Sequence, residues 1–291
     1  MKRLLIATLV LAALPFTAAA QDANANANGN TDGNANAAQN GGWTGSGEFG
    51  FASARGNSRS ENANAKLGLS QENEVWKNNF YLNGLRSKGE VSVTDADGNT
   101  VDKFSTTANR YDTGASVGYK FDPRSYIVTA ARYEHDDFGA NLWQGIVSVG
   151  YGYIALKNER AELSFEIGPG FKRYQPATTT RAVLNPDGTP ATDAEGNALS
   201  QRYTPDAESE VVGRGLINAK YRLTDNTALE DTLLVEAGSK NQYYQNDIGL
   251  SVSMTKKMAL KVGYQIRYNS DTQPGTKSTD KLTTTNLVYN F

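Results

Sequence analysis

Residues 143–153 read WQGIVSVGYGY, and this stretch decides the fold. Trp143, Val147, Val149, Tyr151 and Tyr153 fall on alternate positions, and most of the positions between them carry polar residues or glycine. In a β-strand, successive side chains point to opposite faces. The stretch therefore predicts a strand with one apolar face and one polar face.

The same alternation continues from Trp43 to Phe291, for example in ELSFEIGPGFK at residues 162–172 and in LKVGYQIRY at 260–268. Helical spacing fits neither stretch. Together the runs predict about twelve strands, and single-chain bacterial barrels have an even number. We expect these strands to begin near Trp43, Asn62, Val75, Thr106, Ser125, Asn141, Glu162, Glu210, Thr227, Gln242, Met258 and Asp280.

The connections between these runs alternate between short and long. Tight polar links are expected at residues 72–74, 122–124, 157–160, 224–226 and 255–257. The links between them are expected at 54–60, 88–104, 135–140, 175–206, 238–241 and 269–279. Outer-membrane barrels have short periplasmic turns and longer external loops. The pattern therefore favours such a barrel.

A soluble β-sandwich is the competing fold, because it too has alternating strands and Gly-rich turns. The chain contains 15 Tyr and 10 Phe, many of them at strand ends, where an aromatic girdle would meet the membrane interface. We therefore predict an all-β fold, a transmembrane antiparallel up-and-down β-barrel in the outer membrane of a Gram-negative bacterium. Its surroundings would be outer-membrane lipid.

The chain before the barrel divides into two segments. Residues 1–20 have Lys2 and Arg3 ahead of an apolar run and end in small residues, which predicts a signal peptide. Residues 21–41 are mostly Asn, Ala, Gly and Asp, which predicts a disordered leader. The barrel would occupy residues 42–291. No segment approaches the ~20 consecutive apolar residues of a membrane helix, so a helical membrane protein is excluded.

Charged residues are nearly balanced, with 29 Lys and Arg against 31 Asp and Glu, which gives no reason to expect a nucleic-acid partner. The charges on the polar strand faces must point into the barrel, because Arg or Lys facing lipid at the midplane costs about 2 to 4 kcal/mol. We select as lumen-lining candidates Arg110, Asp112, Arg132, Glu166, Arg214, Glu236, Asp247 and Arg267.

The function of such a lumen depends on its width. Barrels of about eight strands are filled by side chains, and barrels of roughly 16 to 18 strands hold an aqueous channel. The lumen of a barrel of about twelve strands is therefore intermediate in width. One alternative is a narrow channel for small solutes or ions, with Arg110, Arg214 and Arg267 as gate candidates. The other is a structural barrel with its charges locked in ion pairs. We slightly favour the channel.

Three further motifs each have a plain explanation beside a functional one. Tyr289 and Phe291 resemble the C-terminal signal read by the barrel assembly machinery, which we favour over an ordinary last strand. His135 has no serine in its local run, so we expect a polar rim residue rather than the base of a lipid hydrolase. We expect the similar tips at 94–99 and 192–197 to be turns rather than Ca²⁺ sites. The protein is therefore predicted not to be an enzyme and to need no metal or cofactor.

Several of these stretches resemble a known family. They are WTGSGEFG at 43–50, ARGNS at 54–58, GYGY at 150–153, EIGPGF at 166–171 and LVYNF at 287–291. Their order and spacing resemble the salt-induced outer-membrane protein family, the YdiY-like domain of unknown function family 481. The resemblance implies an outer-membrane barrel with a link to salt or envelope stress. It supplies no catalytic residue and no ligand.

Overall fold

The computed structural model describes residues 42–55, 59–94, 99–194, 196–272 and 277–291. The predicted signal peptide at 1–20 and leader at 21–41 lie outside these residues. In the part of the chain that the structure describes, no helix is long and apolar enough to cross a membrane.

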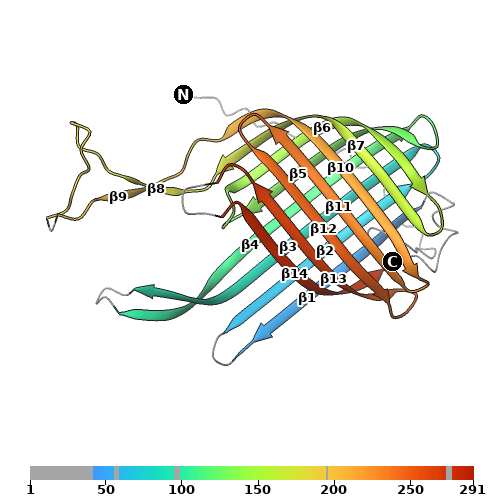
Figure 1. Ribbon diagram of the computed structural model, residues 1–291, viewed down its shortest axis with the longest axis horizontal. Helices are drawn as coiled ribbons and strands as arrows, with labels where there is room; N and C mark the ends of the chain where they lie inside the picture. Colours follow the sequence, from blue (N-terminus) through green and yellow to red (C-terminus); the bar gives the residue numbers. More distant parts are fainter. Residues whose placement is uncertain (1–41, 56–58, 95–98, 195, 273–276) are drawn as a thin grey trace, which may run out of the picture.

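The described residues form a closed antiparallel barrel of twelve strands, ordered β1–β14–β13–β12–β11–β10–β7–β6–β5–β4–β3–β2 (Figure 1). The barrel strands are β1 (Trp43–Ala54), β2 (Ser60–Glu72), β3 (Trp76–Thr94), β4 (Thr100–Lys120), β5 (Ser125–Asp136), β6 (Asn141–Lys157), β7 (Ala161–Pro176), β10 (Glu208–Thr224), β11 (Thr227–Gly238), β12 (Gln242–Ser253), β13 (Met258–Asn269) and β14 (Thr279–Asn290). The predicted twelve-stranded up-and-down barrel is confirmed.

The two faces of the strands settle which side meets lipid. Val147, Ile167 and Phe171 are 59%, 71% and 56% exposed, whereas Glu166 and Lys172 on the opposite face are buried. A soluble sandwich would bury the apolar face instead. The apolar face points outward, so the protein is a barrel of the outer membrane.

Aromatic side chains form a girdle at each end of the barrel wall, as predicted. Near the short turns, Trp76 packs edge-on against Tyr119 with ring centroids 5.6 Å apart. Near the long loops, Tyr244 lies 5.8 Å from Tyr268. Such amphipathic rings suit the interface between lipid headgroups and hydrocarbon. The two girdles mark the borders of the membrane-facing band.

Three of the short turns share one local device. Asn73 Oδ1 accepts hydrogen bonds from the backbone N–H groups of Val75 and Trp76, at 2.9 and 2.6 Å. Asp122 and Asn158 accept two backbone hydrogen bonds in the same way in their own turns. An Asx side chain that bonds to the backbone ahead of it stabilises a tight turn. We call this end of the barrel the turn end and the opposite end the loop end.

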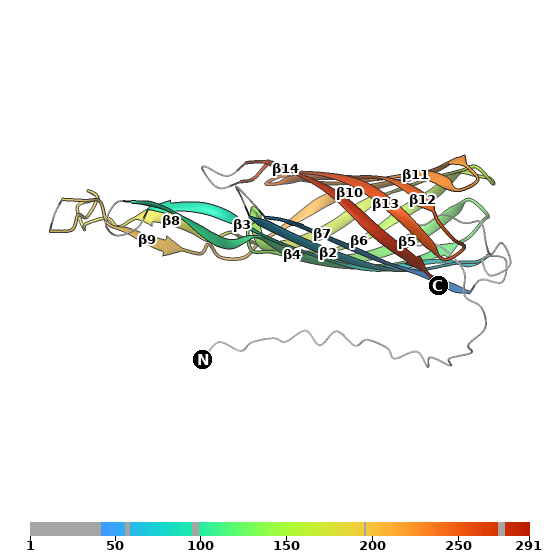
Figure 2. The ribbon, with the colours of Figure 1, turned by 90° about the horizontal axis from the view of Figure 1, so that it is seen from below.

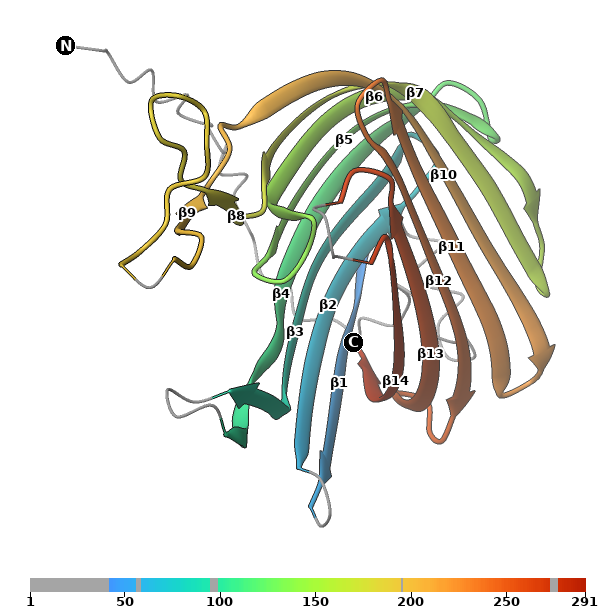
Figure 3. The same ribbon diagram turned by 60° about the vertical axis from the view of Figure 1, so that its left-hand side comes forward.

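The structure corrects two predicted links. Residues 88–104 were expected to form a loop, but β3 continues to Thr94 and β4 begins at Thr100, so the two strands extend beyond the barrel wall (Figures 2 and 3). Val91, Val93 and Val101 alternate there, and β-branched residues favour a strand. The link at 175–206 contains a separate two-stranded sheet, β8 (Thr179–Ala182) and β9 (Ser200–Tyr203).

The described residues of the second predicted tip, which do not include Glu195, form a turn. Gly196 has φ 86°, and Asp193 Oδ1 accepts a hydrogen bond from the backbone N–H of Asn197 at 2.7 Å. Glycine adopts positive φ without steric cost. Residues 95–98 of the first tip, Gly98 included, lie outside the described residues.

Candidate pore and closing layer

A cavity of about 1100 Å³ extends through the lumen from the turn end toward the loop end. At the turn end it is lined by Glu72, Lys157 and Arg160, and toward the loop end by Arg110, Asp112 and Arg132. The alternation of each strand places these side chains inside, because every second residue faces the lumen. A chamber lined by charged, polar and apolar residues therefore occupies much of the lumen.

Ion pairs in the middle of the barrel run along its wall. Arg214 Nη1 lies 3.1 Å from Glu166 Oε2, and β10 and β7 are neighbours in the barrel. Lys261 Nζ lies 3.1 Å from both Glu48 and Glu230. Glu48 is on β1 and Glu230 on β11, each two places from β13 in the strand order. Pairs between near neighbours leave the centre of the lumen open.

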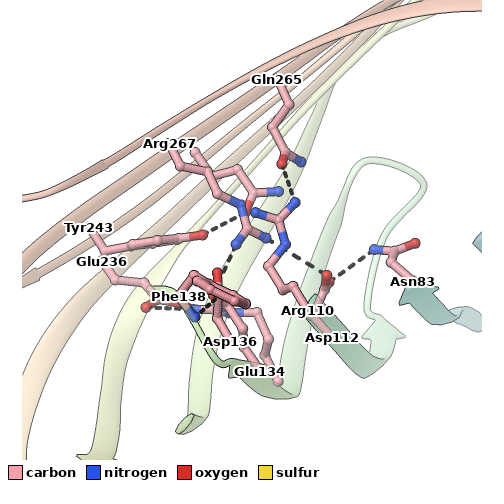
Figure 4. A network of polar contacts seen from close by, with 12 residues as sticks. Asn83, Arg110, Asp112, Glu134, Asp136, Phe138, Glu236, Tyr243, Gln265 and Arg267 are labelled. Atoms are coloured by element: carbon pink, nitrogen blue, oxygen red, sulfur yellow. Dashed lines mark hydrogen bonds and ion pairs between the residues drawn. The ribbon is translucent and has the colours of Figure 1, made fainter. Parts of the chain in front are cut away.

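Ion pairs nearer the loop end cross the lumen (Figure 4). Arg267 Nη1 on β13 lies 2.9 Å from Glu134 Oε1 on β5, and these strands are six places apart in the ring of twelve. Arg110 on β4 donates to Gln265 Oε1 on β13 at 2.8 Å, five places away. Contacts between opposite walls can form only through the lumen.

A second set of contacts completes this layer. Arg132 Nη2 lies 2.8 Å from Glu236 Oε1, and its Nη1 lies 2.7 Å from Glu134 Oε2. Lys172 Nζ lies 3.5 Å from Glu236 Oε2. Tyr243 lies beneath the Arg132 guanidinium, 5.0 Å from ring centroid to Cζ. The layer consists of Arg110, Asp112, Arg132, Glu134, Lys172, Glu236, Tyr243, Gln265 and Arg267, and we call it the closing layer.

The closing layer is thin. A small pocket of about 80 Å³ lies on its loop-end side and is lined by Glu134, Tyr243 and Arg267. Asp112 and Arg132, which contact that trio, line the large cavity on the other side, together with Arg110. One layer of side chains therefore separates the chamber from the loops.

The eight lumen-lining candidates divide between these two regions. Glu166, Arg214 and Asp247 line the large cavity below the closing layer, and Gln265 and Gln245 both donate hydrogen bonds to Asp247. Arg110, Asp112, Arg132, Glu236 and Arg267 belong to the closing layer. Of the three predicted gate residues, Arg214 thus lies apart from the layer, paired along the wall.

Tyr243 is an inward residue of the closing layer that was not among the predicted lumen-lining residues. It is 3% exposed and faces inward beside Glu236. Its position alternates with Gln245 and Asp247 on the polar face of the same strand. That spacing is the signal that would have found it.

The two remaining motifs lie outside the lumen. Tyr289 and Phe291 stack with ring centroids 6.3 Å apart at the turn end and are 48% and 36% exposed. At the loop end, His135 Nε2 lies 2.9 Å from Asp137 Oδ1, and its ring stacks on Tyr111. Hydrogen bonds from Asn109 and His135 hold the pKa of the Asp137 carboxyl below its ordinary value.

Comparison with known families identifies the chain. The model of the family described as "Protein of unknown function, DUF481" matches residues 47–291. The chain belongs to the DUF481 family. A member from Escherichia coli K12, described as "Uncharacterized protein YdiY", is 22% identical over 195 residues, 66% of this chain and 66% of that protein. This DUF481 chain thus spans just under two thirds of the length of that relative.

Solved barrels show a general likeness to this DUF481 protein. The translocator domain of the autotransporter NalP from Neisseria meningitidis has 11% identity and a TM-score of 0.45, covering 86% of this chain and 88% of that one. The COG4313 outer membrane channel from Pseudomonas putida F1 has 12% identity and a TM-score of 0.43, covering 86% and 95%. The NanC porin has 12% identity and a TM-score of 0.41, covering 85% and 98%. At these scores the likeness carries no argument about function.

Proposed function

We propose that this barrel is a narrow, weakly selective channel for small solutes, kept closed by the closing layer. The observation that carries this proposal is the thinness of the barrier. A chamber of about 1100 Å³ ends at one layer of side chains, and a further small pocket lies directly beyond it. A rearrangement of a few side chains would join the two spaces.

Weak selectivity follows from the balance of charge along the chamber. Wall pairs such as Arg214 with Glu166 bring opposite charges close together. Paired opposite charges leave little net field with which to select ions by sign. We therefore expect small conductance steps, below those of sixteen-stranded porins, with weak preference for cation or anion.

Conductance in a planar bilayer tests the proposal. The double variant Arg267→Ala with Glu134→Ala removes the ion pair that spans the lumen between β13 and β5, and it leaves neither partner as a lone buried charge. We expect larger conductance steps than in the wild type. The matched control is Arg214→Ala with Glu166→Ala, which removes a wall pair of the same charge. It lies away from the barrier, so the steps should stay close to wild type.

A structural barrel is the second candidate, and one observation favours it. The closing layer ties opposite walls together, since Arg267 and Glu134 lie six places apart in the strand order. Such a tie would stiffen an envelope protein under salt stress, the condition that the family resemblance implies. Closed behaviour in the wild type and in both double variants would reject the channel in favour of this role.

Salt stress has its own test. A deletion strain grown in high-osmolarity medium should show an envelope defect, such as detergent sensitivity, that the wild-type gene restores. Equal sensitivity of the two strains would remove the stress link and leave the channel proposal standing.

A further inference from the structure

Three lysines converge on a single carboxylate at the turn end of the chamber. Glu72, the last residue of β2, has Lys120 Nζ at 2.6 Å and Lys157 Nζ at 2.8 Å on Oε1. Lys77 Nζ lies 3.2 Å from Oε2 of the same carboxylate. These residues come from the turn-end termini of four strands, β2, β3, β4 and β6. We call them the lysine cluster.

The wider surroundings of the cluster add to its positive charge. Among described residues, the cations in the turn-end half of the lumen are Lys66, Lys77, Lys120, Lys157, Arg160, Lys220, Arg222 and Lys261, and the carboxylates are Glu48, Glu72, Glu159, Glu162 and Glu230. Eight cations thus face five carboxylates. Low-dielectric walls strengthen such a field within a cleft and raise the local concentration of counter-ions.

The loop-end side has no such surplus. The described charges of the closing layer and of the small pocket beyond it are Arg110, Arg132, Lys172, Arg267 and Lys277 against Asp112, Glu134, Asp136, Glu236 and Asp280. An anion in the chamber would therefore be drawn toward the turn end. Because this positive surplus is local, it is compatible with weak selectivity along the whole lumen.

The three lysines differ in how accessible they are. The Lys120 side chain is 7% exposed and also donates to the backbone carbonyl of Asn73 at 3.1 Å. The side chains of Lys77 and Lys157 are 20% and 48% exposed, and both residues line the chamber. Each ammonium has three donors, so both can bind a second oxygen while they remain on Glu72.

We propose that the lysine cluster is a binding site for small oxyanions, solutes that carry a phosphate or carboxylate group. Lys77 and Lys157 would donate to the ligand oxygens, Lys120 would hold Glu72 in place, and Arg160 would add charge at the rim. The proposal deepens the proposed channel function by naming a solute class, and it rests on that function only for onward passage. Binding itself needs no open lumen.

Calorimetric titration of the purified full-length barrel with inorganic phosphate tests the site, in non-ionic detergent at constant ionic strength. We expect saturable binding that weakens at least tenfold in the double variant Lys77→Gln with Lys157→Gln. The control, Lys103→Gln with Lys281→Gln, removes the same charge from exposed positions and should bind as the wild type does. Equal binding by both double variants, or no saturable binding in the wild type, would overturn the proposal.

Glu72→Gln separates binding from a merely structural role. Loss of the resident carboxylate frees donors for the ligand, so we expect tighter phosphate binding, whereas a purely structural cluster predicts no gain. If the other variants fail to fold, the single variant Lys157→Gln tests the same site, because Lys157 is the most exposed of the three lysines. It should still weaken phosphate binding. Acetate in place of phosphate distinguishes a carboxylate site from a phosphate site.

This experiment and the conductance experiment fail independently. Saturable phosphate binding by a barrel that stays closed in every conductance variant would reject the channel and retain the anion site. Conductance without binding would retain the channel and reject the site.

Discussion

At the scale of single residues, the C-terminal Phe291 shows how one residue joins the first and last strands of the barrel. Phe291 exchanges backbone hydrogen bonds with Gly45, at 2.9 Å in both directions. A Cβ added at Gly45 would lie 2.5 Å from the Phe291 ring, so glycine is required for the ring to pack there. The last residue therefore covers the seam at which β1 and β14 close the barrel.

We expect deletion of Phe291 to lower the amount of folded protein in the outer membrane. The deletion removes the outward aromatic that we propose the assembly machinery reads, together with the seam contact to Gly45. Heat-modifiable migration of outer-membrane fractions measures the folded form. Phe291→Trp, which keeps an aromatic ring, is the control and should assemble. Outer-membrane levels of the deletion equal to the wild type would contradict the proposed signal.

His135 gives the second residue-scale prediction. Its partners are the Asp137 carboxylate and the Tyr111 ring, an arrangement that suits a polar residue at the rim. We expect His135→Ala to leave any ester or lipid turnover of the purified protein unchanged, as measured with a chromogenic ester. Asp137→Asn should behave likewise. A large loss of a genuine activity in His135→Ala would show that the barrel is an enzyme.

At the scale of elements, close packing inside the barrel depends on inward glycines. A Cβ added at Gly152 on β6 would lie 2.2 Å from the Tyr126 ring on β5. The ring lies there while its hydroxyl donates to Glu166 at 3.1 Å. The glycine thus creates the space that lets Tyr126 reach a carboxylate on β7.

We expect Gly152→Val to destabilise the barrel by about 1 to 3 kcal/mol, because overpacking moves side chains off their rotamers. The matched control is Gly213→Val, where an added Cβ would have its nearest neighbour at 3.9 Å. Urea unfolding in lipid vesicles, followed by tryptophan emission, measures both. Equal stability of the two variants would show that the Tyr126 side chain can adopt another conformation without cost.

The β8–β9 sheet is a separate element outside the barrel. Thr178 and Thr204 lie at its base with hydroxyl oxygens 2.8 Å apart, so a short linker can bridge the gap. We expect replacement of residues 179–203 by a Gly-Ser linker to leave assembly and conductance unchanged, as measured by heat-modifiable migration and bilayer currents. Loss of folded protein would instead assign this sheet a part in folding.

At the scale of the whole molecule, the closing layer connects strands that are far apart in the sequence. Glu236 is fully buried and holds Arg132 and Lys172, which come from two other strands. Removing one partner of a buried ion pair leaves an uncompensated charge. The stability of the barrel should therefore depend strongly on this residue.

We expect Glu236→Gln to cost about 3 to 5 kcal/mol in the free energy of unfolding. Glu61→Gln, in an exposed pair with Arg59, should change it by no more than about 0.5 kcal/mol. Urea unfolding in vesicles compares the two variants. A small effect of Glu236→Gln would mean that water reaches the layer, which would favour an open lumen.

The sequence by itself determined the fold class, the number of barrel strands and the face that each side chain takes. Those features follow from period-two alternation, which is a local property of the chain. Most strand starts could also be predicted from it. The extension of β3 and β4 could not, because the Gly and charged residues there are typical of a loop. Arg110 and Arg214 were equivalent in the sequence, because both are inward cations.

Only the tertiary structure decided which of them closes the lumen. Arg214 meets Glu166 on a neighbouring strand, whereas Arg110 meets Gln265 five places away across the barrel. The lysine cluster on Glu72 likewise combines residues from four strands. Alternation fixes the face of the strand from which a side chain points. It does not fix the position of the side chain along the barrel axis or its partner on the opposite wall. Those depend on the stagger and tilt of the closed barrel, which are set by all twelve strands together.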